Sequence, residues 1–461
     1  MKTTDIKFFR SPSLGHFINP YSRFSLQSFG HGPSYKKETK PKCPKGFSLQ
    51  SGLNSIVVAS NELPKKSRTS WKVSFLFFFI STFLFAQQVN FDAGIIAQKK
   101  FFETIPYESV FGKIVIPVEI NNKSYRFLLD TGAPNLISKE IYEALNINKL
   151  DSILISDANN LVQKMFATNI PKIQLKDLVF ENQVALVFDF KQHALLNCFN
   201  IDGIIGSNLL KNSILKVSKT EQKIYITDQI KLLQPKSKPA KLKLIGSQKA
   251  PYIVTNLVGI GKTKAVDYVL IDTGMDGMYE MSNRVFDAFE KHQIFETLAT
   301  STGVSGIGLF GAGEPKEQKL FHVKTAQFAA QTFENMFVNT TVDNNSRIGL
   351  DFLDHTDFII DFKHKKVYFE GKNTVVLTDK APKYEPTMMD NQFVIGLVWD
   401  QNLAQEMKFG DKIISIDNTN INEIDFCDIL SLKEQMKDKK NYKIEIKTKE
   451  EQIKTIEINN D

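Results

Sequence analysis

From about residue 110 onward, the chain consists of short runs of β-branched and aromatic residues that are separated by turn residues. Apolar positions with a helical period are confined to a few short stretches. This pattern predicts a mostly β fold with largely antiparallel strands.

The pattern occurs twice in the chain. Lys113–Gly132 and Tyr252–Gly274 each predict a strand, a turn and a second strand that ends in Asp-Thr-Gly. Further on, Gly203–Ile226 resembles Arg347–Phe369, because both contain an apolar stretch with a glycine, a short helix-like turn and a closing hairpin. A repeat of this kind indicates that one structural unit is duplicated.

The spacing within the two copies supports the duplication. Gly206 follows Asp130 by 76 residues, and Gly349 follows Asp272 by 77 residues. We therefore expect two lobes of the same plan, joined by a linker rich in Pro and Lys. Their predicted bounds are 100–235 for the first lobe, 240–372 for the second lobe and 232–242 for the linker.

A third pattern follows the second lobe. It predicts, in this order, a strand, a short helix, a turn with a strand, a longer helix and a final hairpin. The corresponding segments are Phe393–Trp399, Gln401–Met407, Gly410–Asp417, Ile424–Lys437, Tyr442–Thr448 and Gln452–Ile458. This order differs from that of the lobes, so we expect a separate α+β unit, the C-terminal module, at 384–461.

The first 86 residues differ from the rest in composition. They hold 13 of the 58 basic residues and 3 of the 51 acidic ones, so the formal net charge of +7 belongs to this segment. The remaining chain carries 45 basic and 48 acidic residues. A nearly neutral body gives no reason to expect a nucleic-acid partner.

Four basic side chains precede the uncharged, Phe-rich stretch Val73–Ala86, which is the order of a secretory signal peptide. We interpret 65–86 as that signal peptide and 1–64 as a disordered leader. Export to the periplasm or to the cell exterior follows from this interpretation. The alternative is an uncleaved segment at 71–86 that anchors the protein in a membrane.

The few cysteines and histidines limit the metal chemistry of the chain. Three Cys cannot form a four-cysteine zinc site, and none of the seven His lies in an HExxH or other paired metal motif. We therefore expect neither a metal nor another cofactor. Cys198 and Cys427 fall in different predicted units, where buried free thiols are the simplest interpretation, although export would allow them to pair.

Each Asp-Thr-Gly follows an apolar run, so Asp130 and Asp272 emerge from the ends of predicted buried strands. One interpretation is that each Asp only caps a turn. The other is that the two lobes bring the carboxyl groups together. Such a pair shares one proton, so one carboxylate can activate a water molecule while the other carboxyl group stabilises the developing oxyanion.

Two Asp-Thr-Gly strands, each followed by an apolar-apolar-Gly loop at the same spacing, resemble the aspartyl proteases of the pepsin and retropepsin class over residues 100–372. The resemblance implies a two-lobed acid-protease fold with barrel-like β lobes, and peptidase activity on a polypeptide substrate. It implies that Asp130 and Asp272 are catalytic. The residues that would support them, by interlocking the lobes or by close packing, are Thr131, Gly132, Thr273, Gly274, Gly206 and Gly349.

Two residues depart from the pattern of that family. Met275 follows the second Asp-Thr-Gly, where a small or hydroxyl residue is usual, and Arg347 stands in the second apolar-Gly element. A flap over the substrate is expected between each Asp-Thr-Gly and its glycine partner. The candidates are Ser156–Ile170 and Thr302–Gly313. The latter contains a G-x-G-x-x-G match without a following helix, which predicts a mobile loop rather than a dinucleotide site.

The C-terminal module resembles a bacterial PDZ domain, most specifically in the Gly-Asp-x-Ile-Ile-x-Ile-Asp stretch at 410–417. The resemblance implies capture of a peptide C-terminus at a sheet edge, with the carboxylate-binding loop near Thr387–Phe393. The alternative is a structural cap on the protease.

Together these patterns predict an exported aspartic endopeptidase. Two other functions stay open. One is a non-catalytic, extracytoplasmic peptide-binding protein that uses the cleft, the C-terminal module or both. The other is a membrane-anchored scaffold in which the C-terminal module is the working part.

Overall fold

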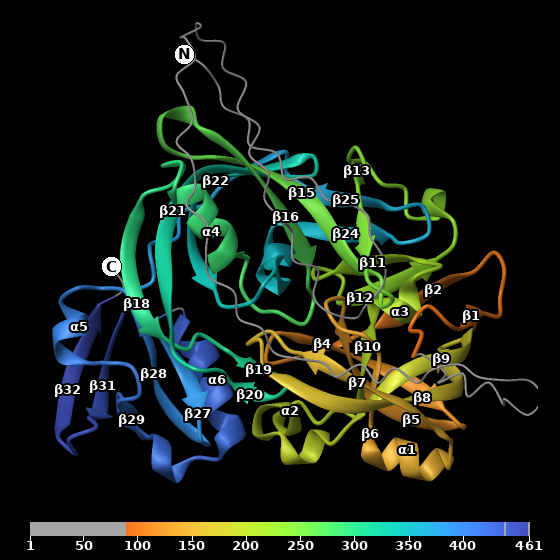
Figure 1. Ribbon diagram of the computed structural model, residues 1–461, viewed down its shortest axis with the longest axis horizontal. Coiled ribbons are helices and arrows are strands. Elements are labelled where there is room, and N and C mark those ends of the chain that lie inside the picture. Colours follow the sequence, from red (N-terminus) through yellow and green to blue (C-terminus); the bar gives the residue numbers. More distant parts are fainter. Residues whose placement is uncertain (1–88, 438, 460–461) are drawn as a thin grey trace, which may run out of the picture. The chain divides into compact units, whose positions relative to one another are not determined.

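The computed structural model describes residues 89–437 and 439–459 (Figure 1). The predicted leader (1–64), signal peptide (65–86) and alternative anchor (71–86) lie outside the described residues. Within the described residues strands dominate, which confirms the prediction of a mostly β fold. No helix in this part of the chain is long and apolar enough to cross a membrane.

A first nine-stranded sheet is formed by residues 95–206, in the order β1-β9-β6-β10-β5-β4-β8-β7, with β3 paired to β4. Its strands are β1 (Ile95–Ile96), β3 (Glu108–Val110), β4 (Lys113–Ile120), β5 (Lys123–Asp130), β6 (Leu136–Ser138), β7 (Lys149–Ser156), β8 (Val162–Leu175), β9 (Leu178–Phe188) and β10 (Gly203–Gly206). The helices of this region are α1 (Lys139–Leu145), α2 (Ala194–Cys198) and α3 (Ser207–Leu210). In the centre of the sheet, β10 runs parallel to β5, so Gly206 lies opposite Asp130.

A second nine-stranded sheet has the order β14-β15-β16-β23-β17-β22-β21-β18, with β26 paired to β22. Its strands are β14 (Lys243–Ile245), β15 (Ala250–Val258), β16 (Lys264–Ile271), β17 (Tyr279–Ser282), β18 (Thr297–Gly303), β21 (Lys316–Phe328), β22 (Gln331–Thr341), β23 (Ser346–Ile348) and β26 (Thr374–Val376). Helix α4 (Asn283–Glu290) follows β17, and the small hairpin β19 (Ile307–Gly308) with β20 (Gly311–Ala312) lies between β18 and β21. Strand β23 runs parallel to β16, just as β10 runs parallel to β5. The two sheets therefore share one central arrangement.

A six-stranded sheet joins strands from both copies of the repeat, in the order β13-β25-β24-β11-β12-β2. Its strands are β2 (Phe102–Pro106), β11 (Ile214–Ser218), β12 (Lys223–Thr227), β13 (Ala240–Lys241), β24 (Thr356–Asp361) and β25 (Lys366–Gly371). The junction is the antiparallel pair β11–β24, where Leu215 lies opposite Ile360. One large apolar core contains residues of both copies, so they fold against each other. The segment predicted as a linker contributes β13 to this sheet.

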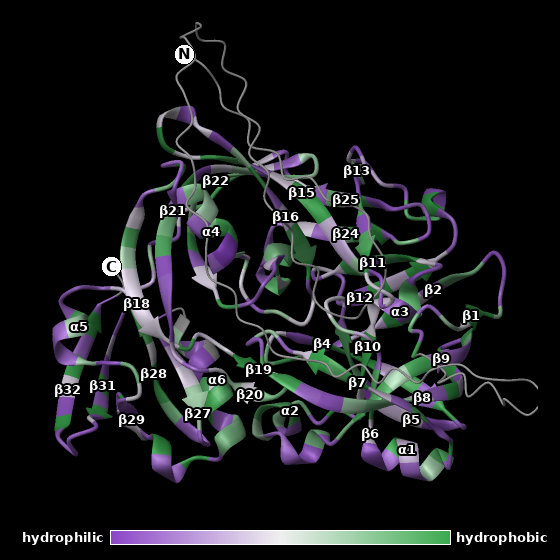
Figure 2. Cartoon of the chain, in the orientation of Figure 1, coloured by the Kyte–Doolittle hydropathy of each residue, from purple (hydrophilic) through white to green (hydrophobic). Residues whose placement is uncertain are grey.

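The C-terminal module has its own sheet, in the order β27-β28-β29-β31-β32, and its own apolar core. Its strands are β27 (Tyr384–Met389), β28 (Gln392–Val398), β29 (Lys412–Ile416), β30 (Thr419–Asn420), β31 (Asn441–Lys447) and β32 (Ile453–Asn459), and its helices are α5 (Leu403–Glu406) and α6 (Phe426–Lys437). The module also contains the short 3-10 helix η5 (Ile421–Glu423), and the 3-10 helices before it in the chain are η1 (Phe190–Gln192), η2 (Ile230–Leu232), η3 (Ile260–Lys262) and η4 (Leu350–Asp354). Strand β31 alternates polar and apolar residues, as the hydropathy colouring of Figure 2 illustrates. Its residues Ile444 and Ile446 are buried in the core of the module.

The prediction of a carboxylate-binding loop near Thr387–Phe393 is wrong. This segment is the end of β27, a two-residue turn and the beginning of β28. The turn residues Asp390 and Asn391 both have positive φ, at 51° and 59°. Such angles are typical of the tight turns that connect antiparallel strands, and Asp and Asn tolerate them.

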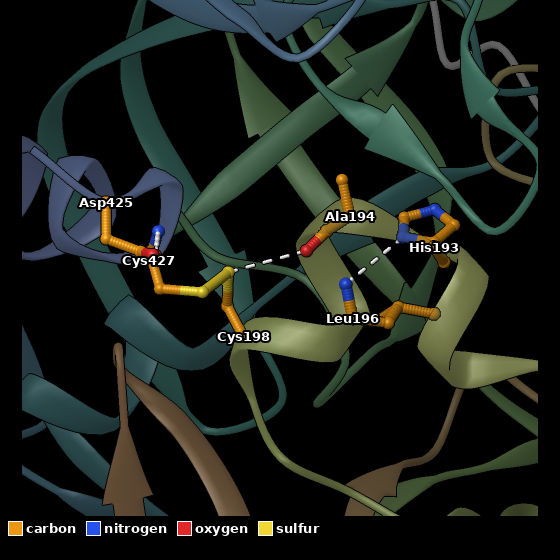
Figure 3. The surroundings of a disulfide bond; sticks show 6 residues. All are labelled: His193, Ala194, Leu196, Cys198, Asp425 and Cys427. Atoms are coloured by element: carbon orange, nitrogen blue, oxygen red, sulfur yellow. Dashed lines mark hydrogen bonds between the residues drawn. A yellow bond between two sulfur atoms is a disulfide. The ribbon is translucent and has the colours of Figure 1, made fainter. Parts of the chain in front are cut away.

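Cys198 and Cys427 form a disulfide, so their interpretation as free thiols is wrong (Figure 3). Their Cα atoms lie 5.2 Å apart although 229 positions separate them in the sequence. Cys198 is the last residue of α2, and Cys427 lies in the first turn of α6. The bond therefore ties the C-terminal module to the first copy of the repeat.

Candidate active site

The two Asp-Thr-Gly turns lie at equivalent places in the two nine-stranded sheets. Asp130 is the last residue of β5, and Asp272 follows the end of β16 directly. In each turn the glycine N–H donates to the carboxylate two positions earlier, at 2.8 Å for Gly132 to Asp130 Oδ1 and at 2.9 Å for Gly274 to Asp272 Oδ1. Each Asp thus caps its own turn, and this contact fixes the direction of its carboxyl group.

The threonines of the two turns bind each other reciprocally. The Thr131 N–H donates to Thr273 Oγ1 at 3.0 Å, and the Thr273 N–H donates to Thr131 Oγ1 at 3.1 Å. Each hydroxyl in turn donates to a carbonyl oxygen of the opposite strand, at Ile271 and Leu129. Both threonines are fully buried. These four hydrogen bonds lock the two turns together.

The glycines of the turns allow the carboxyl groups to approach each other. A Cβ atom at Gly132 would lie 2.8 Å from Asp272 Cγ, and a Cβ atom at Gly274 would collide with the carboxyl group of Asp130. Only glycine fits at such close approaches. Each carboxyl group therefore lies against the glycine of the opposite Asp-Thr-Gly turn.

The environment of Asp130 favours its protonated form. Burial, followed by the negative charge of Asp272, raises the pKa of Asp130 to about 7. The N–H of Gly132 and the charge of Lys113 act in the opposite direction, with smaller effects. A carboxyl pair of this kind holds one proton in the acidic to neutral range.

Gly206 and Gly349 lie against the backbone that follows each Asp-Thr-Gly. The Gly206 N–H donates to Asn135 Oδ1 at 2.9 Å, and a Cβ atom at Gly349 would lie 2.6 Å from the carbonyl oxygen of Met275. Met275 itself is buried. The structure thus brings together all eight residues that the sequence analysis placed at this site.

Two cations beside the pair were not assigned to the site from the sequence. Lys113 reaches from β4 to the second turn, where its Nζ donates to the carbonyl oxygen of Gly274 at 2.6 Å and pairs with Asp276. Arg347 Nη1 lies 3.6 Å from Asp272 Oδ2. A charged residue in an otherwise apolar element was the one available signal for Arg347. Lys113 gave no such signal, because a lysine at the start of a strand is common.

The two predicted flap segments contact each other. In the first, Asn159 lies at the tip of the β7–β8 hairpin, and its Nδ2 donates to the carbonyl oxygens of Gly306 and Gly311 at 3.1 and 2.9 Å. The Phe310 N–H donates to Asp157 Oδ2 at 2.9 Å. The segment 302–313, called the second loop below, is therefore held by the tip of the first hairpin.

The second loop also contacts α2 and the C-terminal module. His193 Nε2 lies 3.1 Å from the carbonyl oxygen of Gly308. His193 Nδ1 accepts a hydrogen bond from the N–H of Leu196 in α2 (Figure 3). The Val304 N–H donates to the carbonyl oxygen of Gly396 in β28, and Ile307 packs against the apolar core of the module. Three separate parts of the chain thus hold this loop.

Residues 116–209 match the family model described as aspartyl protease. Among curated proteins none matches this chain. Among solved structures, an aspartic proteinase from Irpex lacteus is similar, with 11% identity and a TM-score of 0.36 over 59% of this chain and 98% of that one. The family match supports an aspartyl protease-like domain that includes residues 116–209. Among the described residues, no cluster of His, Cys, Asp and Glu side chains is arranged to hold a metal ion.

Proposed function

We propose that this protein is an aspartic endopeptidase that hydrolyses peptide bonds with a water molecule activated by Asp130 and Asp272. The observation that carries the proposal is the pair of Asp-Thr-Gly turns. They come from separate sheets, they are locked by reciprocal threonine hydrogen bonds, and the glycine of each turn lies against the carboxyl group of the other. The match of residues 116–209 to the aspartyl protease family supports it.

The reaction uses the single proton of the pair. The ionised carboxylate removes a proton from a bound water molecule, whose oxygen attacks the scissile carbonyl carbon, while the protonated carboxyl group gives its proton to the carbonyl oxygen. The neutral tetrahedral intermediate then collapses. One carboxyl group protonates the leaving nitrogen, the other recovers a proton from a hydroxyl group of the intermediate, and the C–N bond breaks. The pair returns to its original state with one proton.

We further propose that the protein acts outside the cytoplasm. The signal-peptide pattern at 65–86 supports export, with membrane anchoring by 71–86 as the alternative. The Cys198–Cys427 disulfide supports it independently, because disulfides persist in oxidising compartments. Cell fractionation tests this proposal, and protein found only in the cytoplasm would contradict it.

Cleavage of a diverse peptide mixture tests the proposed activity. The full chain, expressed with its own leader, would be compared with its Asp130→Asn and Asp272→Asn variants between about pH 3 and 8. We expect cleavage by the native protein, loss of cleavage in both variants and inhibition by a compound that mimics the tetrahedral intermediate. Peptides that bind without being cleaved would instead support the non-catalytic peptide-binding function.

The C-terminal module supports a separate binding role. Strand β27 pairs with β28 on one side and is an edge strand of the described sheet. An extended peptide can add to such an edge through backbone hydrogen bonds. Binding of labelled peptides with a free or an amidated C-terminus tests this role. A preference for the free carboxylate supports capture of a peptide C-terminus, and the absence of binding supports the structural cap.

A further inference from the structure

The two copies of the repeat place different residues beside the carboxyl pair. Ile204 in β10 lies opposite Leu128, next to the strand that carries Asp130. At the equivalent place in the second copy, Arg347 in β23 lies opposite Leu270 in β16. The backbone arrangement is therefore the same in the two copies, but the side chain at this position is apolar beside Asp130 and positively charged beside Asp272.

We propose that Arg347 is a positioning residue that holds the negative charge of the pair on Asp272 and leaves the shared proton on Asp130. This inference rests on the proposed peptidase function. It assigns the first step: Asp272 removes the proton from water, and Asp130 protonates the carbonyl oxygen of the substrate.

The guanidinium group of Arg347 is fixed in place. Its side chain is 13% exposed, its Nη2 donates to Glu280 Oε2 at 2.9 Å, and its Nη1 lies 3.5 Å from Asp343 Oδ2 and 3.6 Å from Asp272 Oδ2. A buried cation keeps its charge when carboxylates surround it, and the planar guanidinium suits several partners at once. Asp272 thus faces a permanent positive charge.

The charges around Asp130 differ. Its carboxylate accepts N–H groups from Gly132 and Ala133, and Lys113 is the cation that acts on it. The ammonium group of Lys113, however, is directed to the carbonyl oxygen of Gly274 and to Asp276. Arg347 thus pairs directly with one carboxyl group of the pair, Asp272, whereas the acidic partner of Lys113 is Asp276.

The remaining acidic groups near the pair are Asp343 and Glu280. Burial raises the pKa of Asp343 to about 6, while Arg347 acts to lower it. When Asp343 is ionised, its negative charge opposes loss of the shared proton. Glu280, the other acidic partner of Arg347, accepts a hydrogen bond from its Nη2.

The pH dependence of kcat/KM tests the inference in the full chain. Arg347→Gln removes the positive charge, so the carboxyl pair should hold its shared proton more tightly. The fall of kcat/KM at alkaline pH, called the alkaline limb, should then move to higher pH by about one unit. Arg347→Lys keeps the charge and should keep the limb within a few tenths of a unit. The matched control is Arg284→Gln. Arg284 lies in α4 and donates to the carbonyl oxygen of Asn344, not to the carboxyl pair.

An Arg347→Gln profile that superimposes on the native one would overturn the inference, and so would an equal shift in Arg284→Gln. If Arg347→Gln does not fold, Asp343→Asn tests the inference instead, and the expected shift has the opposite direction. This variant removes a negative charge that competes with Asp272 for the guanidinium group of Arg347. Its alkaline limb should move to lower pH, and an unmoved limb would overturn the inference. A native protein that cleaves nothing overturns the proposed function instead.

Discussion

At the scale of single residues, Thr131 and Thr273 hold the two turns in register, and neither can be replaced by an isosteric apolar residue without cost. In Thr131→Val, the N–H of Thr273 and the carbonyl oxygen of Ile271 lose their partner inside the protein. Two buried polar groups without partners should cost about 2–4 kcal/mol in the free energy of unfolding. Urea unfolding measures this loss, and Thr131→Ser, which keeps the hydroxyl group, is the control. Equal stability of the Val and Ser variants would contradict the importance of the lock.

A second residue-scale prediction concerns Asp267, which is buried and accepts a hydrogen bond of 2.8 Å from the hydroxyl group of Tyr279. Burial raises its pKa from 3.8 to about 6 in the folded protein. A carboxyl group with a raised folded-state pKa contributes stability that is fully present below its unfolded pKa and is lost as pH rises through the folded value. Native stability should therefore fall between about pH 4 and 6 through this group.

The variant Asp267→Asn removes this titration. Its melting temperature should depend less steeply on pH over that window than the native melting temperature does. The surface variant Asp379→Asn serves as the control, because Asp379 is exposed. Parallel pH profiles for the native protein and Asp267→Asn would contradict the prediction.

At the scale of secondary-structure elements, the second loop depends on the tip of the β7–β8 hairpin. Asn159→Ala removes both hydrogen bonds from Nδ2 to the carbonyl oxygens of Gly306 and Gly311. We expect faster hydrogen–deuterium exchange at 303–313 and little change elsewhere, since each bond stabilises by about 1 kcal/mol. Asn256→Ala is the control, because this exposed Asn makes one long contact of 3.5 Å with Gln327. Unchanged exchange in Asn159→Ala would show that other contacts hold the loop.

The sequence could predict those parts of the structure that depend on local patterns. Strand alternation predicted the β fold, and the repeated Asp-Thr-Gly at matched spacing predicted which residues come together. In the C-terminal module, the segment 424–437 was predicted as a helix and forms α6 at Phe426–Lys437.

What local patterns could not show are contacts between distant segments. The contact of Lys113 with the turn at Gly274 spans 161 positions, and the Cys198–Cys427 bond spans 229. Both depend on how the sheets and the C-terminal module are placed, and no periodicity encodes that. The turn at Asp390 and Asn391 was missed for another reason: a family resemblance suggested a binding loop where the turn chemistry of these two residues already favoured a hairpin.

At the scale of the whole molecule, apolar packing and the Cys198–Cys427 disulfide both hold the C-terminal module against the rest of the described chain. Trp399 is buried in a cluster with Leu320 of β21 and Leu397 of β28, so its fluorescence reports on this junction. Closing a loop of 229 residues restricts the unfolded chain, and such a disulfide stabilises by about 3–5 kcal/mol. In the Cys198→Ser/Cys427→Ser variant, the Trp399 signal should therefore change at lower urea than in the native protein. A Trp71→Phe background removes the other tryptophan of the chain.

The same variant should also affect the second loop, because α2 contacts that loop at one end and is bonded to α6 at the other. His193, at the N-terminus of α2, contacts Gly308 in that loop, while Cys198 at the other end is bonded to α6. Without the bond, α2 and the module can separate, and Ile307 loses the fixed position of the core against which it packs. Hydrogen–deuterium exchange at 303–313 should increase in the double variant and in the reduced native protein alike. Reductant should have no further effect on the double variant. An exchange rate that is insensitive to both changes would contradict the prediction that the disulfide helps to hold the loop.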